Sequence, residues 1–214
     1  MDRLLAWTTG DVPPPLILWF NTPYEIGMDW ALITLVLSFA MLEYSINVFS
    51  RGLKPLQEKI PFLQLEQFNE YFKRLYFRQL FLLVAVGGIS IIGTYYAVNS
   101  LMVFQDTVPE IKDFFANTLT TRVFWIASIS YLFLTIGLLH CLFFLTLDQP
   151  VFAMYAVLGG LIVNFTIGFI CSRIIAFDYA TIGLLAGSIA FAILSGFMAR
   201  TFFKKLDYFY YSAF

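Results

Sequence analysis

The stretch VFWIASISYLFLTIGLLHCLFFL, from Val123 to Leu145, decides the fold. It contains no aspartate, glutamate, lysine or arginine, and apolar side chains fill most of its positions. About 20 mainly apolar residues in an α-helix are enough to cross the hydrocarbon core of a bilayer. The stretch therefore predicts a transmembrane helix.

Four further stretches of the chain have the length and apolar character of a membrane span. The five predicted spans are Asp29–Phe49, Leu80–Met102, Val123–Leu145, Val151–Cys171 and Ala180–Ala199. The first is the weakest, because its apolar core ends at Leu42 and polar residues follow. The pattern predicts an all-α, polytopic membrane helix bundle over residues 29–214, preceded by a separate N-terminal segment over residues 1–28.

The composition agrees with a membrane protein and excludes several other classes. The 214-residue chain is 60% hydrophobic and 13% charged, whereas a soluble domain has about 45–50% apolar and about 25% charged residues. The net charge of −1 provides no field that would attract nucleic acid. Two cysteines, Cys141 and Cys171, exclude a disulfide framework and a cysteine-rich metal site. The apolar run in Met1–Trp7 is too short for a signal peptide.

Two connections between the spans have distinct character. Thr8–Met28 holds four prolines, which interrupt a straight helix, so we expect an interfacial loop on the exported side. Ser50–Gln79 is the longest polar connection. Within it, over residues 57–79, apolar side chains share one helical face and charged side chains lie largely off that face. This pattern predicts an amphipathic helix lying in the membrane surface.

The distribution of lysine and arginine predicts the orientation. Nine of the thirteen basic residues lie on one side of the predicted spans: Arg51, Lys54, Lys59, Lys73, Arg74, Arg78, Arg200, Lys204 and Lys205. We therefore expect a protein of the cytoplasmic membrane with its C-terminus in the cytoplasm. Five spans then place the N-terminus outside. An exported N-terminus without a signal suggests that a preceding helix is missing from this chain.

Glu43 is the most informative polar residue of the predicted spans. Ala40, Glu43, Asn47 and Ser50 follow a three- and four-residue spacing, which places them on one face of a helix. A carboxylate within a span costs about 2.5–3.5 kcal/mol and usually faces a cavity or a partner. One interpretation is that Glu43 and Asn47 line a substrate-facing cavity. The alternative places Glu43 near the cytoplasmic interface, solvated or paired with a basic residue of the following loop.

Asn164 and several glycines point to close helix contacts. Asn164 lies in the middle of the fourth span near Gly159 and Gly160, so it either contacts substrate or forms an interhelical hydrogen bond. Gly183 and Gly187 form a GxxxG motif in the fifth span, which favours either dimerisation or packing within the bundle.

No set of residues indicates catalysis or a cofactor. His140 is the only histidine, and its neighbour Cys141 points about 100° away on a helix, so neither a zinc site nor another metal site is predicted. Asp148 lies in a short turn, Thr146–Pro150, where a solvated aspartate is common. We therefore expect a protein that is not an enzyme.

The sequence resembles the C-terminal half of a known exporter family. The opening Asp2–Trp7, DRLLAW, and the tail Leu206-Asp207-Tyr208 are similar to segments of the Pel exopolysaccharide exporter family, G subunit. That family belongs to the multidrug/oligosaccharidyl-lipid/polysaccharide (MOP) flippase superfamily, which includes MATE-type transporters. The amphipathic connection, the ending Leu142-Phe143-Phe144, the Asp148 turn and the mid-span Asn164 also fit.

The resemblance implies a role in polysaccharide export and biofilm formation. Family members are about twice as long, with twelve helices in two lobes, so five helices correspond to the C-terminal lobe. The implied partners are a polysaccharide substrate, the lipid bilayer, and a missing N-terminal lobe or a second copy of the chain. A truncated, split or fragmentary gene product would fit this length. The alternative function is a non-transporting membrane scaffold that anchors a cytoplasmic glycosyltransferase or another partner.

Overall fold

The computed structural model describes residues 2–9, 21–59, 65–103, 117–204, 206 and 208, and all regular structure in these ranges is helical. The α-helices are α1 (Asp2–Trp7), α2 (Thr22–Lys59), α3 (Leu65–Val103), α5 (Thr118–Thr146), α6 (Pro150–Ile174) and α7 (Ala180–Lys204). A 3-10 turn, η3 (Phe177–Tyr179), precedes α7. Five of these helices are long and apolar enough to cross a membrane, which confirms the predicted all-α helix bundle.

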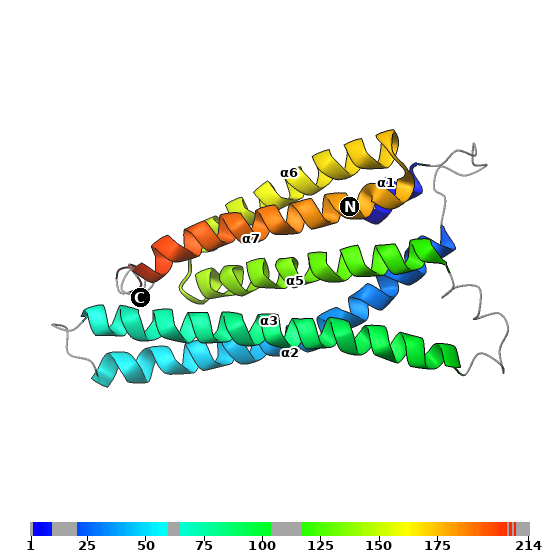
Figure 1. Cartoon of the computed structure of the whole chain (residues 1–214). Coiled ribbons are helices and arrows are strands. Elements are labelled where there is room, and N and C mark those ends of the chain that lie inside the picture. Colours follow the sequence, from blue (N-terminus) through cyan, green and yellow to red (C-terminus); the bar gives the residue numbers. More distant parts are fainter. Residues whose placement is uncertain are drawn as a thin grey trace.

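The long helix α5 lies at the centre of the bundle (Figure 1). It packs against α2 on one side and against α7 on the other. The helix α3 lies beside α2, and α6 lies beside α7, so two helix pairs flank α5. The short helix α1 contacts α6, α7 and η3, which joins the start of the chain to its last helices.

Many side chains on the outer faces of the helices are both large and apolar. Phe81 is 73% exposed, Ile162 is 65% exposed and Phe197 is 67% exposed. Soluble proteins rarely show a continuous apolar surface of this kind, because water makes it unfavourable. In a bilayer, the same faces would contact hydrocarbon.

The first long helix begins earlier than the sequence indicated. Residues 22–28 were predicted as part of an exported loop, but they form the first two turns of α2. Pro23 fits there because the first turn of a helix needs no backbone N–H donor from that position. Asn21 caps the helix, since its side-chain oxygen accepts a hydrogen bond from the Tyr24 N–H at 3.3 Å. Residues 13–15, the three remaining prolines of the predicted loop, lie outside the described residues.

Residues 57–79 do not form the separate surface helix that the sequence predicted. Residues 57–59 end α2, and residues 65–79 form the first part of α3, which continues without a break into the second span. No proline or glycine occurs between Leu65 and Val86 to interrupt that helix. Its apolar face, with Phe68, Phe72 and Leu75, is buried inside the protein rather than free to lie on lipid.

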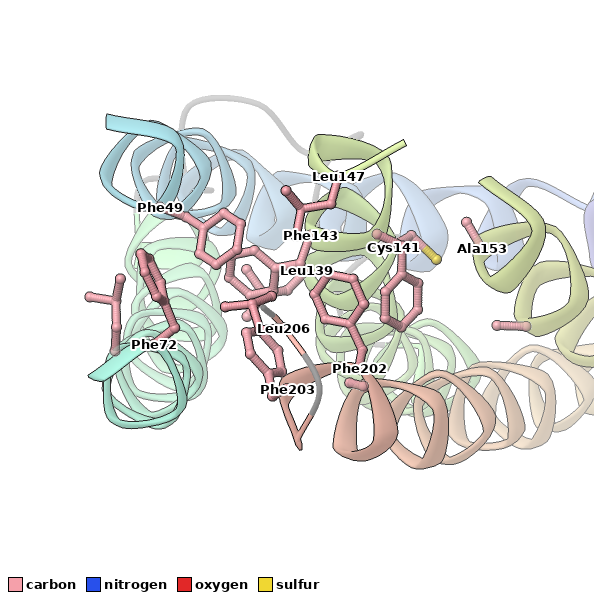
Figure 2. Close-up of a cluster of buried hydrophobic side chains, with 14 of the residues drawn as sticks. Phe49, Phe72, Leu139, Cys141, Phe143, Leu147, Ala153, Phe202, Phe203 and Leu206 are labelled. Atoms are coloured by element: carbon pink, nitrogen blue, oxygen red, sulfur yellow. The ribbon is translucent and has the colours of Figure 1, made fainter. Parts of the chain in front are cut away.

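An aromatic cluster forms the core at the end of the bundle where α2 ends, α3 begins and α7 ends. We call this end the basic end, because Arg51, Lys73, Arg200 and Lys204 lie there. Phe49 packs against Phe72 with ring centroids 5.2 Å apart and against Phe143 with centroids 4.6 Å apart. These rings, together with Phe203, come from α2, α3, α5 and α7 (Figure 2). The cluster therefore holds four helices in a fixed arrangement.

Candidate functional site

The predicted polar face of the first span lines an open groove. Glu43, Asn47 and Ser50 are all exposed on α2, and they face a groove with a volume of about 690 Å³. Leu138 and Leu142 of α5 form the opposite wall. The spacing that placed these polar residues on one helix face therefore also places them at one surface feature.

Glu43 lies well inside its helix. Sixteen residues separate it from Lys59 at the end of α2, about 24 Å at 1.5 Å per residue. Within the described part of the chain, Glu43 has no ion pair with any basic side chain. Of the basic side chains in the following segment, that of Arg51 does not pair with Glu43, and those of Lys54 and Lys59 lie outside the described residues. A charge at such a position requires water or a partner in the groove.

Asn164 occupies a different site. It is buried on α6 and borders a smaller cavity of about 150 Å³ between α5, α6 and α7. Its side-chain oxygen Oδ1 has no hydrogen-bond partner among the described residues. Leu138 borders both this cavity and the Glu43 groove, so the two features lie on either side of one α5 side chain. The structure thus brings Glu43 and Asn47 together and keeps Asn164 apart from them.

The predicted glycines lie in the contact between α6 and α7. A methyl group on Gly187 would approach the Gly160 carbonyl oxygen to 2.8 Å, and one on Gly183 would approach the backbone nitrogen of Gly168 to 2.5 Å. Both distances are shorter than ordinary contacts of a Cβ atom. Gly159 is less constrained, because a methyl there would meet the movable side chain of Leu194. The GxxxG motif is therefore occupied by α6 of the same chain.

His140 joins three helices. It is 2% exposed on α5, and its ring nitrogens lie 2.7 Å from the Tyr76 hydroxyl of α3 and 2.8 Å from the Ser195 hydroxyl of α7. Ser195 donates its own hydrogen to the Ala192 carbonyl at 3.2 Å. Nδ1–H of His140 therefore donates to Ser195, and Nε2 accepts from Tyr76. This bonding gives His140 a structural role, and no group of three or more potential metal ligands occurs among the described residues.

A charged cluster that the sequence did not predict lies at the end of the bundle opposite the basic end. Arg3 of α1 forms ion pairs with Glu25 at 2.8 Å and with Asp29 at 2.6 Å, both on α2. The Trp7 indole N–H donates to Glu25 at 2.6 Å. Burial lowers the pKa of Arg3, but the hydrogen bond to Asp29 and the attraction to both carboxylates outweigh burial, and the pKa is raised. The four-residue spacing of Glu25 and Asp29 was the only feature of the sequence that could have indicated this cluster.

Comparison of the chain with protein-family models, with curated proteins and with solved structures gives no match.

Proposed function

We propose that this chain is one lobe of a polysaccharide exporter of the cytoplasmic membrane, and that the Glu43 groove is the part of its translocation pathway that this lobe supplies. The observation that carries the proposal is a carboxylate on a membrane-length helix that faces an open groove and forms no ion pair with a described residue. In membrane proteins, ionisable residues in such positions usually border a substrate or ion path.

The chemistry of the groove suits a carbohydrate. The Glu43 carboxylate accepts hydrogen bonds, and the Asn47 amide and the Ser50 hydroxyl both donate and accept them. Sugar hydroxyls need partners of both kinds. Phe39 also lines the groove and is 48% exposed, so it offers an aromatic face to the apolar side of a sugar ring. The resemblance to the Pel exporter family supports the same substrate class.

The open shape of the groove supports the need for a second lobe. The described helices border the groove on the α2 and α5 sides, and one lobe cannot enclose a path through the membrane. In transporters built from two halves, one bundle rocks against the other around a central site. A partner lobe or a second copy of this chain would close the groove and alternate its access between the two sides of the membrane.

Cysteine accessibility tests whether the groove contains water. Glu43→Cys, in a background with Cys141 and Cys171 replaced by alanine, should react in intact membranes with a charged, membrane-impermeant thiol reagent. The matched control is Phe81→Cys on the outer face of α3. The Gln79 amide donates to the Ser45 carbonyl at 3.0 Å, so residues 81 and 43 lie at a similar depth. Equal labelling of E43C and F81C would contradict a water-filled groove.

An export assay tests the role of Glu43. In cells that depend on this gene for surface polysaccharide, Glu43→Gln should reduce the exported polysaccharide at least tenfold with normal protein levels. Tyr44→Phe provides the control, since Tyr44 is 54% exposed but does not line the groove. Full export by E43Q would remove Glu43 from the proposed pathway.

The scaffold alternative has one structural observation in its favour. The helices α2 and α3 contain 38 and 39 residues, about 57 and 59 Å, so both exceed the hydrocarbon thickness of about 30 Å. At the basic end both extend past the nearby end of α5 (Figure 1), and a partner protein could bind there. The test replaces the exposed Glu66 and Glu70 at the start of α3 with lysine. Loss of a co-purifying glycosyltransferase, with E43Q fully active, would favour the scaffold.

A further inference from the structure

A second groove lies between α3 and α7 at the basic end of the bundle. Its volume is about 440 Å³, and it shares no lining residue with the Glu43 groove. Three basic side chains border it: Lys73 from α3, and Arg200 and Lys204 from α7. Each is exposed, and none has an ion pair or hydrogen bond with another described residue. The groove therefore carries three positive charges without a protein counter-charge in the described part of the chain.

The three charges face one groove from two helices. Arg200 and Lys204 are four residues apart, so they project from the same face of α7. The two walls are held at a fixed separation, because the Tyr76 and Phe203 rings pack with centroids 4.7 Å apart. Tyr76 is fixed further by its hydrogen bond to His140. Two rigid helices therefore present the three cations around a preformed groove.

Exposed apolar side chains continue from the cations toward the middle of the bundle. On α3, Phe77 and Phe81 follow Lys73 at four-residue intervals and are 56% and 73% exposed. On α7, Phe197 and Ile193 precede Arg200 at intervals of three and four residues and are exposed as well. Each helix face thus changes from positive at the basic end to apolar toward the bilayer centre, the same order as a phospholipid from headgroup to acyl chain.

The floor of the groove is open because of a glycine. A methyl group on Gly196 would touch only the His140 ring, at 3.6 Å, which is an ordinary contact. Because Gly196 lines the groove, a large side chain at this position would fill part of it. Gly196 therefore offers a means of blocking the groove without removing any charge.

We propose that the α3–α7 groove binds an anionic phospholipid, with the headgroup phosphate on the three bases and the acyl chains on the exposed apolar side chains beside them. Basic pockets between membrane helices bind anionic headgroups in this way. The charge of the groove excludes a preference for zwitterionic lipid, and its apolar continuation distinguishes a lipid from a free phosphate ion. The proposal is independent of what the Glu43 groove transports.

Native mass spectrometry of the purified chain tests the proposal. The protein is titrated with phosphatidylglycerol or with phosphatidylcholine of the same acyl chains. We expect at least tenfold tighter binding of phosphatidylglycerol. In the variant K73Q/R200Q/K204Q this preference should fall to less than twofold. The control variant R51Q/R74Q/R78Q removes three charges from exposed arginines at the same end that do not line the groove, and it should keep the preference.

Two further arms separate a built lipid site from simpler explanations. Gly196→Phe should abolish the preference although all three bases remain. An excess of inorganic phosphate should leave phosphatidylglycerol bound. Equal loss of preference in the two triple variants, unchanged binding in G196F, or displacement by phosphate would each overturn the proposal. The same holds if the unmodified protein shows no preference.

Discussion

The contact between α6 and α7 gives the sharpest test of the bundle. In Gly183→Ala, the new methyl group would overlap the Cα of Gly168 and lie 2.5 Å from its nitrogen and 2.8 Å from the Asn164 carbonyl oxygen. All three are backbone atoms, so no side chain can rotate away. Ordinary Cβ contacts begin near 3.4 Å, and α6 must therefore move away by roughly 1 Å. Overpacking of this kind costs about 1–3 kcal/mol.

Gly88→Ala is the matched control. Gly88 lies inside α3 with nothing within 4 Å of the position that a methyl group would occupy. Both substitutions gain up to about 1 kcal/mol of helix propensity, so the difference between the two variants isolates the packing cost. For a chain of this size, 1 kcal/mol corresponds to about 2–4 °C in Tm. We expect the Tm of G183A to lie about 2–12 °C below that of G88A.

A thiol-reactive dye provides the assay. Cys141 is 5% exposed in the folded protein and becomes reactive only on unfolding. Cys171 is partly exposed, so it is replaced by alanine in every variant to remove the background signal. Melting curves of the detergent-purified proteins then give the Tm directly. Equal Tm values for G183A and G88A would refute the close α6–α7 packing.

Three further predictions use the same melting assay. Phe49→Ala should lower the free energy of unfolding by about 3–5 kcal/mol, because Phe49 is fully buried among aromatic rings. The control is Tyr44→Ala, since the Tyr44 side chain is exposed. An equal loss of stability in both variants would contradict the position of Phe49 in the core. His140→Phe should lower the free energy of unfolding by about 1–3 kcal/mol, since it leaves the Tyr76 and Ser195 hydroxyls without their histidine partner. In a Tyr76→Phe background the loss of stability should be smaller. An equal loss in both backgrounds would argue against the hydrogen bond between Tyr76 and His140. In double-mutant cycles, the coupling energy of Arg3 with Glu25 should exceed that with Asp29, because the Glu25 side chain is 16% exposed and the Asp29 side chain is 64% exposed. A stronger coupling to Asp29 would contradict this effect of solvent screening.

The number of membrane-length helices could be predicted from the sequence, but their ends could not. Apolar runs such as Val123–Leu145 are set by the thickness of a bilayer, so their count follows from composition. A helix ends where its backbone hydrogen bonds end, and this point differs from the end of the apolar run. For this reason α2 begins before Asp29 and α3 begins well before Leu80.

The candidate site was partly predictable for the same kind of reason. Glu43 and Asn47 share a helix face by spacing within one segment, and the structure places both at one groove. Contacts between distant segments leave no such periodic pattern. Arg3 meets Asp29 across 26 residues, and Tyr76 meets His140 across 64. Neither pairing could be read from one segment, because it depends on how the helices are arranged in space.

The position of α1 has a consequence for biosynthesis. Among the described helices, α1 is synthesised just before α2, to which Arg3 and Trp7 bind, and well before α6, η3 and α7, which form the rest of its contact surface. The hydrogen bonds from Arg173 to the Thr8 and Thr9 hydroxyls likewise join an early segment to a late one. During translation α1 can therefore pair with α2 first, and its contacts with α6, η3 and α7 form only later. The full contact surface of α1 is complete only when translation has passed α7.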